Sequence, residues 1–285
     1  MKKTLIAIFI IYTFIILLVG RNLGFLPVFF AKSEAKVVDD TKKSVVEKFI
    51  KEQGPKFSIY YKNLKTGASF GVDENKILTA ASLNKILIAS YLYNQADRKK
   101  IDLEEKITIQ EKDLQDYGTG SIRYEGAGGV YTLKTLAKLA LEQSDNTAAF
   151  VLSEKLGRGE IEEYGKSLGL VTTNIADNKT SAKDMGILLE LIFNRKIANN
   201  ALTLEFLDFM KDTDFEDRLA RDLPKSVAVY HKAADGISLV HDAGIIGDEN
   251  FPFILSILTN EVRDEEEVKK TIGQITKFIY DGRTN

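Results

Sequence analysis

Hydrophobic positions recur with the helical period of about 3.6 residues in several separate segments of the chain. Residues 41–53, 133–140 and 185–192 each carry one apolar stripe, as does the final segment, which begins at Asp264 behind an acidic first turn. The segment that begins at Ser82 differs, because its apolar residues surround the helix almost completely. Helices of that kind are buried on every side, so we expect this one at the centre of the fold.

Short runs of β-type residues stand at both ends of the helical region. Residues 57–61 and 69–72, joined by a turn over 63–67, predict a hairpin. Further strands are predicted in the C-terminal third, over 227–232, 239–245 and 253–258. Strands at both ends with helices between them indicate a sheet assembled from both termini and a helical insertion. The predicted fold class is therefore α+β.

The N-terminus has the pattern of an export or anchoring signal. Lys2 and Lys3 precede an apolar run over 5–19, and a second apolar stretch covers 23–31. This length lies between a long signal-peptide core and a short membrane span. We favour a retained anchor with the lysines in the cytoplasm and everything after Lys36 outside; cleaved secretion stays open.

We therefore expect a signal or membrane-anchor segment over residues 1–31, a polar linker over 32–40 and one composite domain over 41–285. The predicted localisation is membrane-anchored and facing outside the cytoplasm, or secreted after signal cleavage.

Composition narrows the chemistry. The 285 residues carry a net charge of −2, with no basic stripe interleaved with aromatic residues, so a nucleic-acid partner is not expected. The absence of cysteine excludes disulfides, thiolate metal sites and a cysteine nucleophile. The two histidines, His231 and His241, are too few for a histidine-rich metal site. We expect neither a metal nor an organic cofactor.

Ser82 and Lys85 form the first candidate catalytic pair, in the string Ser-Leu-Asn-Lys. Ser82 stands where the central helix begins, and free backbone N–H groups there favour a developing oxyanion. Lys85 follows three residues later on the same helical face. On its own the string is equally typical of a helix-capping serine beside a solvated lysine.

Ser144, Asp145 and Asn146 form the second candidate motif, directly after a predicted helix. A turn between two helices, with Ser144 or Asp145 capping the next helix, is the simpler interpretation. Both can hold, because one turn can cap a helix and still present Ser144 and Asn146 to a cleft.

The two motifs in this order resemble those of the class A β-lactamase-like serine hydrolases, part of the penicillin-recognising enzyme group. The resemblance covers roughly residues 41–280 and rests on three segments: LTAASLNKILIASYLY, YTLKTLAKLALEQSDNTAAFVLSEKLG and VYHKAADGISLVHDAGII. It implies an antiparallel sheet flanked by helices, an all-helical subdomain, and a cleft between them. Residues 41–285 would then be the catalytic domain.

By that resemblance Ser82 would be the acylated nucleophile, with Lys85 as its base or proton relay. Ser144 would pass a proton to the leaving nitrogen, and Asn146 would hold an amide of the substrate. Tyr117, next to the Gly118-Thr119-Gly120 turn, would lie at an aromatic rim of the cleft, although a plain loop tyrosine is an equal alternative. Asp145 would be structural and anchor the turn.

The third motif of the family is altered here. The resemblance implies a lysine on an edge strand, followed by a hydroxyl residue and a glycine, but this chain has Lys232, Ala233 and Ala234. The hydroxyl that would bind a substrate carboxylate is therefore missing. Lys232 could still bind substrate and lower the pKa of Lys85, or it could be only a strand lysine. If the register holds, the oxyanion hole would use the backbone N–H groups of Ser82 and Asp235.

A literal Lys65-Thr66-Gly67 occurs in the predicted hairpin turn, ahead of Ser82. We interpret it as unrelated to the site. His241-Asp242 looks like a catalytic pair, but we interpret it as structural.

The loop before residue 184 is poor in acids. The resemblance implies a glutamate there that activates the deacylating water, yet no glutamate lies between Glu163 and Glu190. Asp177 could substitute for it, but we prefer a turn aspartate beside Asn178. Slow or negligible deacylation is therefore expected.

The sequence predicts an exported serine hydrolase of the class A type, acylated at Ser82 by β-lactams or D-Ala-D-Ala-like amides. Its partners would be a small β-lactam or a peptidoglycan stem peptide, with the membrane reached through the N-terminal segment; we expect a monomer. Two alternatives stay open: a penicillin-binding D,D-peptidase or esterase, and a non-catalytic cell-wall-binding module on the same fold.

Overall fold

The computed structural model describes residues 39–247 and 249–282. The predicted leader over 1–31 and most of the predicted linker lie outside these residues. Within them, no helix combines the length and apolar character that a membrane crossing requires. The first described helix begins at Asp40, the last residue of the segment predicted as linker.

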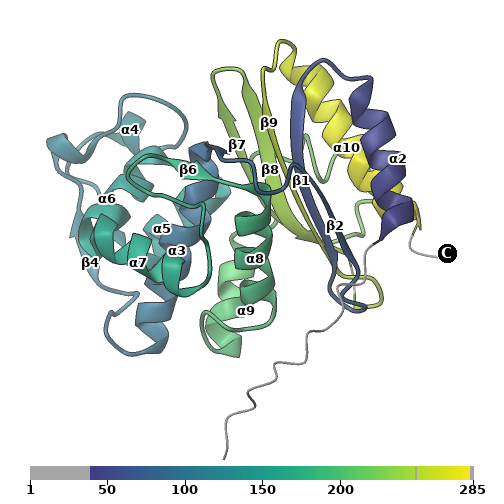
Figure 1. Ribbon diagram of the computed structural model, residues 1–285. Coiled ribbons are helices and arrows are strands. Elements are labelled where there is room, and N and C mark those ends of the chain that lie inside the picture. The colour runs from purple at the N-terminus through teal and green to yellow at the C-terminus, as the bar shows by residue number, and fades with distance from the viewer. Residues whose placement is uncertain (1–38, 248, 283–285) are drawn as a thin grey trace, which may run out of the picture. The chain divides into compact units, whose positions relative to one another are not determined.

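A five-stranded antiparallel sheet forms the centre of the domain, in the order β2-β1-β9-β8-β7. Its strands are β1 (Lys56–Asn63), β2 (Ser69–Val72), β7 (Val229–Gly236), β8 (Leu239–Ile246) and β9 (Phe253–Asn260). β1 pairs with β9 along its whole length, with Tyr60 opposite Ser256. The prediction of a sheet assembled from both ends of the chain is thus confirmed (Figure 1).

Two helices cover one face of this sheet (Figure 1): α2 (Asp40–Lys51) and α10 (Glu265–Asp281). The side chains of Asp39 and Asp264 accept hydrogen bonds from the first-turn N–H groups of these helices. The apolar stripe of α10 is buried at Ile272 and Ile275, and it shares one core with alternate residues of β9 such as Leu255. Both helices therefore follow the predicted apolar stripes.

The other face of the sheet is covered by α8 (Ala182–Phe193) (Figure 1). The helix comes so close that a Cβ on Gly186 would lie 2.1 Å from Tyr60 Cδ1, which only glycine avoids. The remaining alternate residues of β9, among them Ile254 and Leu258, pack on this side.

The helical subdomain is built around α3 (Asn84–Asp97), which continues from a short 3₁₀ turn, η1 (Ala81–Leu83). Its other helices are α4 (Ile122–Glu125), α5 (Leu133–Glu142), α6 (Asn146–Leu156), α7 (Arg158–Ser167) and α9 (Asn200–Asp208), with the 3₁₀ turn η2 (Glu111–Asp113). Two small ladders complete it: β3 (Leu78–Thr79) with β6 (Lys179–Thr180), and β4 (Lys106–Thr108) with β5 (Val130–Thr132).

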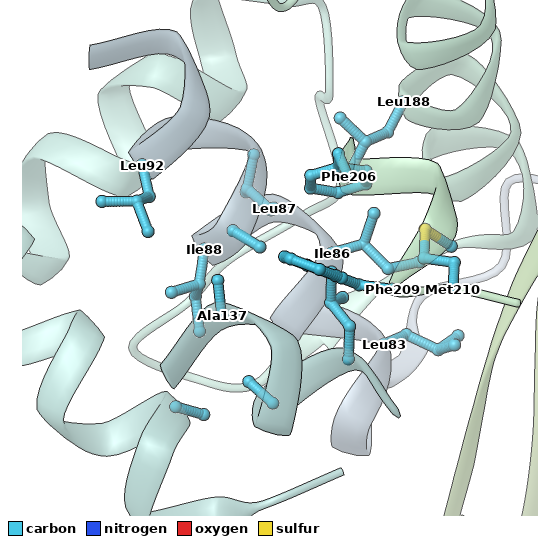
Figure 2. Close-up of a cluster of buried hydrophobic side chains, with 14 of the residues drawn as sticks. Leu83, Ile86, Leu87, Ile88, Leu92, Ala137, Leu188, Phe206, Phe209 and Met210 are labelled. Carbon is cyan, nitrogen blue, oxygen red and sulfur yellow. The ribbon is translucent and has the colours of Figure 1, made fainter. Parts of the chain in front are cut away.

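The central position predicted for the helix after Ser82 is confirmed. Leu83, Ile86 and Leu87 are at most 1 % exposed, and Figure 2 shows the α3 side chains packed among those of the surrounding helices, including Leu188 and Phe206. A helix buried on all sides cannot rotate or slide without opening cavities. The residues at its start are therefore held in fixed positions.

The hydrophobic pattern did not predict helices that bury few of their side chains. α7 and α9 were not predicted, and α7 buries only Ile161 and Gly165, so it lacks a readable stripe. The strand expected from residue 227 begins at Val229, because Val227 N–H donates to Pro224 O in a turn.

Candidate active site

A cleft of about 630 Å³ lies where η1, the turn before α6 and the end of β7 meet. Among the described residues that line it are six of the seven predicted site residues: Ser82, Lys85, Tyr117, Ser144, Asn146 and Asp235. Ser82 and Asp235, which are 153 positions apart in the chain, are thus brought to one place. The seventh predicted residue, Lys232, does not line the cleft.

The Lys85 side chain connects the first two motifs. Its Nζ lies 3.1 Å from Ser82 Oγ and 3.1 Å from Ser144 Oγ. It also lies 2.5 Å from Ser144 O and 2.7 Å from Asn146 Oδ1. The two nearest partners are carbonyl oxygens, which only accept hydrogen bonds.

A neutral Lys85 amine can satisfy these contacts. A neutral amine has two N–H donors and one lone pair; the donors match Ser144 O and Asn146 Oδ1, leaving the lone pair for a hydroxyl. Ser82 Oγ, at 3.1 Å, can donate to that lone pair. The arrangement can therefore take the proton of a serine nucleophile.

Electrostatics favours the same neutral form. Burial of Lys85 lowers its pKa well below the ordinary value of 10.5, and the nearby charge of Lys232 lowers it further against the opposing influence of Asp145. This agrees with the expectation that the positive charge of Lys232 lowers the pKa of Lys85.

The backbone at both motifs is strained. Ala81, just before Ser82, has φ +47°, and Ser144 has φ +57°, a left-handed conformation that residues with a Cβ rarely adopt. In Ser144 this conformation accompanies the approach of both its carbonyl and its hydroxyl to Lys85. Such strain is characteristic of sites where the surrounding structure fixes a reactive geometry.

Asp145 anchors the second motif, as predicted. Its Oδ1 accepts from Ala148 N at 2.8 Å and so caps α6, while its Oδ2 accepts from Ile122 N at 2.9 Å. The capping and the site-forming interpretations of this turn therefore hold together.

Asn146 is oriented by the loop that carries Tyr117. Its Nδ2 donates to Tyr117 O at 2.9 Å. Gly118 allows this contact, because it has φ +73° and a Cβ there would lie 2.2 Å from the Asn146 amide nitrogen. Tyr117 itself is 63 % exposed and forms part of the cleft edge.

The residues whose N–H groups are the predicted oxyanion donors lie on η1 and β7, which are in contact. His231 N–H donates outside the sheet, to Met210 O, and successive N–H groups along a strand point to opposite sides. The Asp235 N–H, four residues on in the same unbroken register, therefore points to the free edge of β7. The 3₁₀ turn η1 lies against β7, and Ser82 N–H is in its first turn, where helical N–H groups lack intrahelical acceptors.

Lys232, which was expected to bind substrate, is buried in the structure. The side chain is 1 % exposed, and its Nζ donates to Ala233 O at 3.0 Å instead of reaching the cleft. Burial lowers its pKa to about 7, with Asp242 opposing and Arg218 adding to that effect. What Lys232 offers the site is a partial positive charge behind the strand.

Arg218 is a residue behind the site that the sequence did not reveal; it bonds to Asp235, which lines the cleft. It is 1 % exposed and bonds to Asp235 Oδ2 at 2.8 Å, although it stands in a polar segment with no motif. Its neighbourhood in the sequence, which alternates acids and bases, carries no periodic signal.

The two histidines are structural. His241 receives Thr259 N–H on Nδ1 and lies 2.9 Å from Thr79 O through Nε2, so it holds β8 against β9 and β3. Asp242 pairs with His231, not with its sequence neighbour, at 2.8 Å.

The acid-poor loop contributes amides to the cleft. Asp177 is exposed, bonds through its N–H to Asn174 Oδ1 and does not line the cleft, so the turn interpretation was correct. Asn178 does line it and accepts a hydrogen bond from Asn84 Nδ2 at 3.0 Å. Ile175 from the same loop also lines the cleft, and the side chains of Asn84 and Asn178 were not singled out from the sequence.

Lys65, Thr66 and Gly67 lie in the β1–β2 turn, as expected, where Asn63 Oδ1 accepts from Lys65 N and Thr66 N. Over residues 39–247 and 249–282, no group of three or more acidic or histidine side chains is placed to hold a metal ion.

The chain matches the family model described as the beta-lactamase enzyme family over residues 41–282. It is 27 % identical over 254 residues to Beta-lactamase 3 of Bacillus cereus, covering 82 % of this chain and 79 % of that protein. It is 24 % identical over 228 residues to Beta-lactamase BRO-1 of Moraxella catarrhalis, covering 72 % and 73 %.

Solved structures give the same picture of the fold. A point mutant of PBP-A, determined as an acyl-enzyme complex with penicillin G, superposes with a TM-score of 0.81 at 23 % identity, over 86 % of this chain and 96 % of that one. A β-lactamase from Sphaerobacter thermophilus gives 0.80 at 19 % identity, over 86 % and 97 %. The predicted fold class is confirmed by these likenesses.

His231 is buried beside Asp242 and Glu216, and this predicts that the free energy of unfolding depends on pH. Burial alone would lower the pKa of His231, but Asp242 and Glu216 outweigh it and raise the pKa from 6.5 to about 9. A raised pKa stabilises the fold below pH 6.5, and this contribution is lost as the pH rises through about 9. At about 1.4 kcal/mol per pKa unit the contribution is roughly 3 kcal/mol.

We therefore expect the unfolding free energy lost in His231→Gln to shrink as the pH rises from 6.5 to about 9, measured by urea denaturation. His241→Gln is the matched control, because burial lowers the pKa of His241 and its loss should not shrink over that range. A penalty for His231→Gln that is equal at all pH values would contradict the assignment.

Proposed function

This chain belongs to the beta-lactamase enzyme family, and we propose that its Ser82 is acylated by β-lactams or by D-Ala-D-Ala-like amides. The observation that carries the proposal is the position of Lys85 Nζ, 3.1 Å from both Ser82 Oγ and Ser144 Oγ. One amine thus contacts a hydroxyl that can attack and a hydroxyl that can pass a proton on.

In the proposed acylation, neutral Lys85 takes the proton from Ser82 Oγ while this oxygen attacks the carbonyl carbon. The oxyanion is stabilised by the backbone N–H groups of Ser82 and Asp235. The proton then passes from Lys85 through Ser144 Oγ to the leaving nitrogen, and the C–N bond breaks. The product is an ester on Ser82, with all protons accounted for.

Deacylation is proposed to be slow. Hydrolysis of the ester needs a base for the incoming water, and Asp235 is the sole carboxylate among the described residues that line the cleft. That carboxylate is ion-paired to Arg218 at 2.8 Å. The loop side of the cleft contributes Ile175 and Asn178 instead of an acid.

A second candidate function follows from the same absence: a penicillin-binding D,D-peptidase or esterase, whose natural esters or peptides are turned over while lactam adducts persist. The relatives named above are β-lactamases, but their low identity to this chain leaves the substrate open. The non-catalytic wall-binding alternative rests on Ala233 and Ala234, which line the cleft without a hydroxyl. The contacts of Lys85 with Ser82 and Ser144 favour acylation over it.

Export is part of the proposal and rests on the sequence alone. Lys2 and Lys3 followed by the apolar run over 5–19 favour an N-terminal segment that takes the domain out of the cytoplasm, either as an anchor or as a cleaved signal. This location would give the site access to peptidoglycan stem peptides.

Labelling with a fluorescent penicillin tests the acylation. We expect one adduct on the wild-type protein and none on Ser82→Ala, because Ser82 carries the hydroxyl proposed to attack. Ser144, whose hydroxyl lies at the same distance from Lys85, is proposed only to relay a proton. Ser90→Ala is the matched control: Ser90 lies on α3, the helix that continues from η1, is fully buried, and its loss should leave labelling unchanged. Labelling that survives Ser82→Ala would sink the nucleophile assignment.

A long chase after labelling, followed by intact mass measurement, tests turnover. The adduct should persist in the wild-type protein, and a released penicilloate with rapid loss of the adduct would refute slow deacylation. Turnover of a D-Ala-D-Ala peptide or an ester under conditions where the lactam adduct persists would favour the peptidase or esterase.

Ile175→Glu should speed the loss of the adduct. The substitution introduces a carboxylate on the loop side of the cleft, and a placed general base is typically worth about 10²–10⁴-fold, so at least about tenfold is expected here. Ile175→Gln has nearly the same shape without the charge and should stay slow. Equal chase rates for the two variants would show that a missing base is not what limits deacylation.

A further inference from the structure

The β7 side of the cleft carries a carboxylate. Asp235 is the one acid among the described lining residues, and its side chain is 40 % exposed. The two residues before it, Ala233 and Ala234, also line the cleft and offer no hydroxyl. A substrate group beside this strand therefore meets a carboxylate and methyl groups.

The nearby guanidinium uses four of its five N–H donors within the protein itself. Arg218 donates from Nε to Asp217 Oδ1 at 3.0 Å and from Nη2 to Asp235 Oδ2 at 2.8 Å. Its Nη1 donates to the backbone oxygens of Ala234 and His241, at 3.3 and 3.1 Å. At 1 % exposure it does not extend into the cleft. Asp235 therefore occupies the position in which a carboxylate of the substrate could otherwise pair with Arg218.

The other cationic side chains near the cleft also have partners within the protein. Lys232 is buried and bonded to Ala233 O. Arg158 lines the cleft from the start of α7, where Glu154 pairs with it at 3.0 Å. Lys85 is engaged with its four partners from Ser82, Ser144 and Asn146.

We propose that this cleft selects acyl donors whose group beside β7 is neutral or cationic, such as an ester, a carboxamide or an amine, over donors with a carboxylate there. Asp235 is the residue that sets this preference. The inference rests on the proposed acylation of Ser82 and narrows the substrates of that site. Among the acyl donors proposed above, amides or esters within a longer chain or with a capped terminus react faster than those with a free C-terminal carboxylate.

The physical basis is repulsion between like charges. A carboxylate brought within about 5 Å of Asp235 in a half-buried cleft loses binding by about tenfold or more, while a neutral ester loses nothing. A protonated amine at the same place gains a partner. Because the Asp235 N–H is also a proposed oxyanion donor, its side chain lies next to the reacting group.

Three forms of one penicillin isolate the charge: the free acid of benzylpenicillin, its methyl ester, and its diethylaminoethyl ester, which carries a protonated amine. The rate of adduct formation on the wild-type protein, followed by intact mass, should be lowest for the acid and at least about tenfold higher for both esters. An acid that acylates as fast as the methyl ester would overturn the proposal.

Asp235→Asn should abolish the preference, because it removes the charge and releases one Arg218 donor while keeping the backbone N–H. The acid-to-ester rate ratio should rise about tenfold or more. Asp217→Asn is the matched control, since Asp217 also pairs with Arg218 and is equally exposed at 40 % but does not line the cleft. Its ratio should equal that of the wild-type protein, and a rise equal to that of Asp235→Asn would contradict the role of Asp235.

A binding measurement separates this inference from the acylation it builds on. Dissociation constants of the acid and the methyl ester for Ser82→Ala, from calorimetric titration, report selection without a covalent step. Tighter binding of the ester supports the inference even if no penicillin labels Ser82, an outcome that would end the acylation proposal. Equal or tighter binding of the acid overturns the inference even if labelling succeeds.

Discussion

The site depends on one amine held away from water. Lys85 Nζ is surrounded by two carbonyl oxygens at 2.5 and 2.7 Å and two hydroxyls at 3.1 Å. An ammonium group in this position would lose its hydration and lie near Lys232, so the neutral form is favoured. Neutrality changes Lys85 from a structural cation into a base, and the proposed chemistry of Ser82 follows from that.

The rest of the domain keeps this amine in place. The central helix α3 is buried on all sides, so its first turn cannot shift relative to the turn before α6. Asp145 fixes that turn from beneath through two N–H groups, and Gly118 lets the neighbouring loop hold Asn146. The strained conformations of Ala81 and Ser144 persist because packing and hydrogen bonds on both sides determine them.

The sequence predicted the elements whose signals are local. The stripe of α10, the all-round apolar α3 and the hairpin of β1 and β2 each have a pattern within a few residues, and the two serine motifs do as well. The sequence left the position of the Lys232 side chain open, because a lysine on a strand can point to the cleft or bond to its own backbone, and only the fold decides. Arg218 was missed because its partners, Asp235 and the backbone of Ala234 and His241, lie 16 or more positions away.

Titration of Lys85 tests this account most directly. Carbon NMR of lysines labelled at Cε, assigned with Lys85→Arg, reports the pKa of this one amine. We predict a pKa well below 10.5, which moves upward in Lys232→Gln because a neighbouring positive charge is removed. A Lys85 that titrates near 10.5, unaffected by Lys232→Gln, would contradict the claim that a neutral lysine activates Ser82.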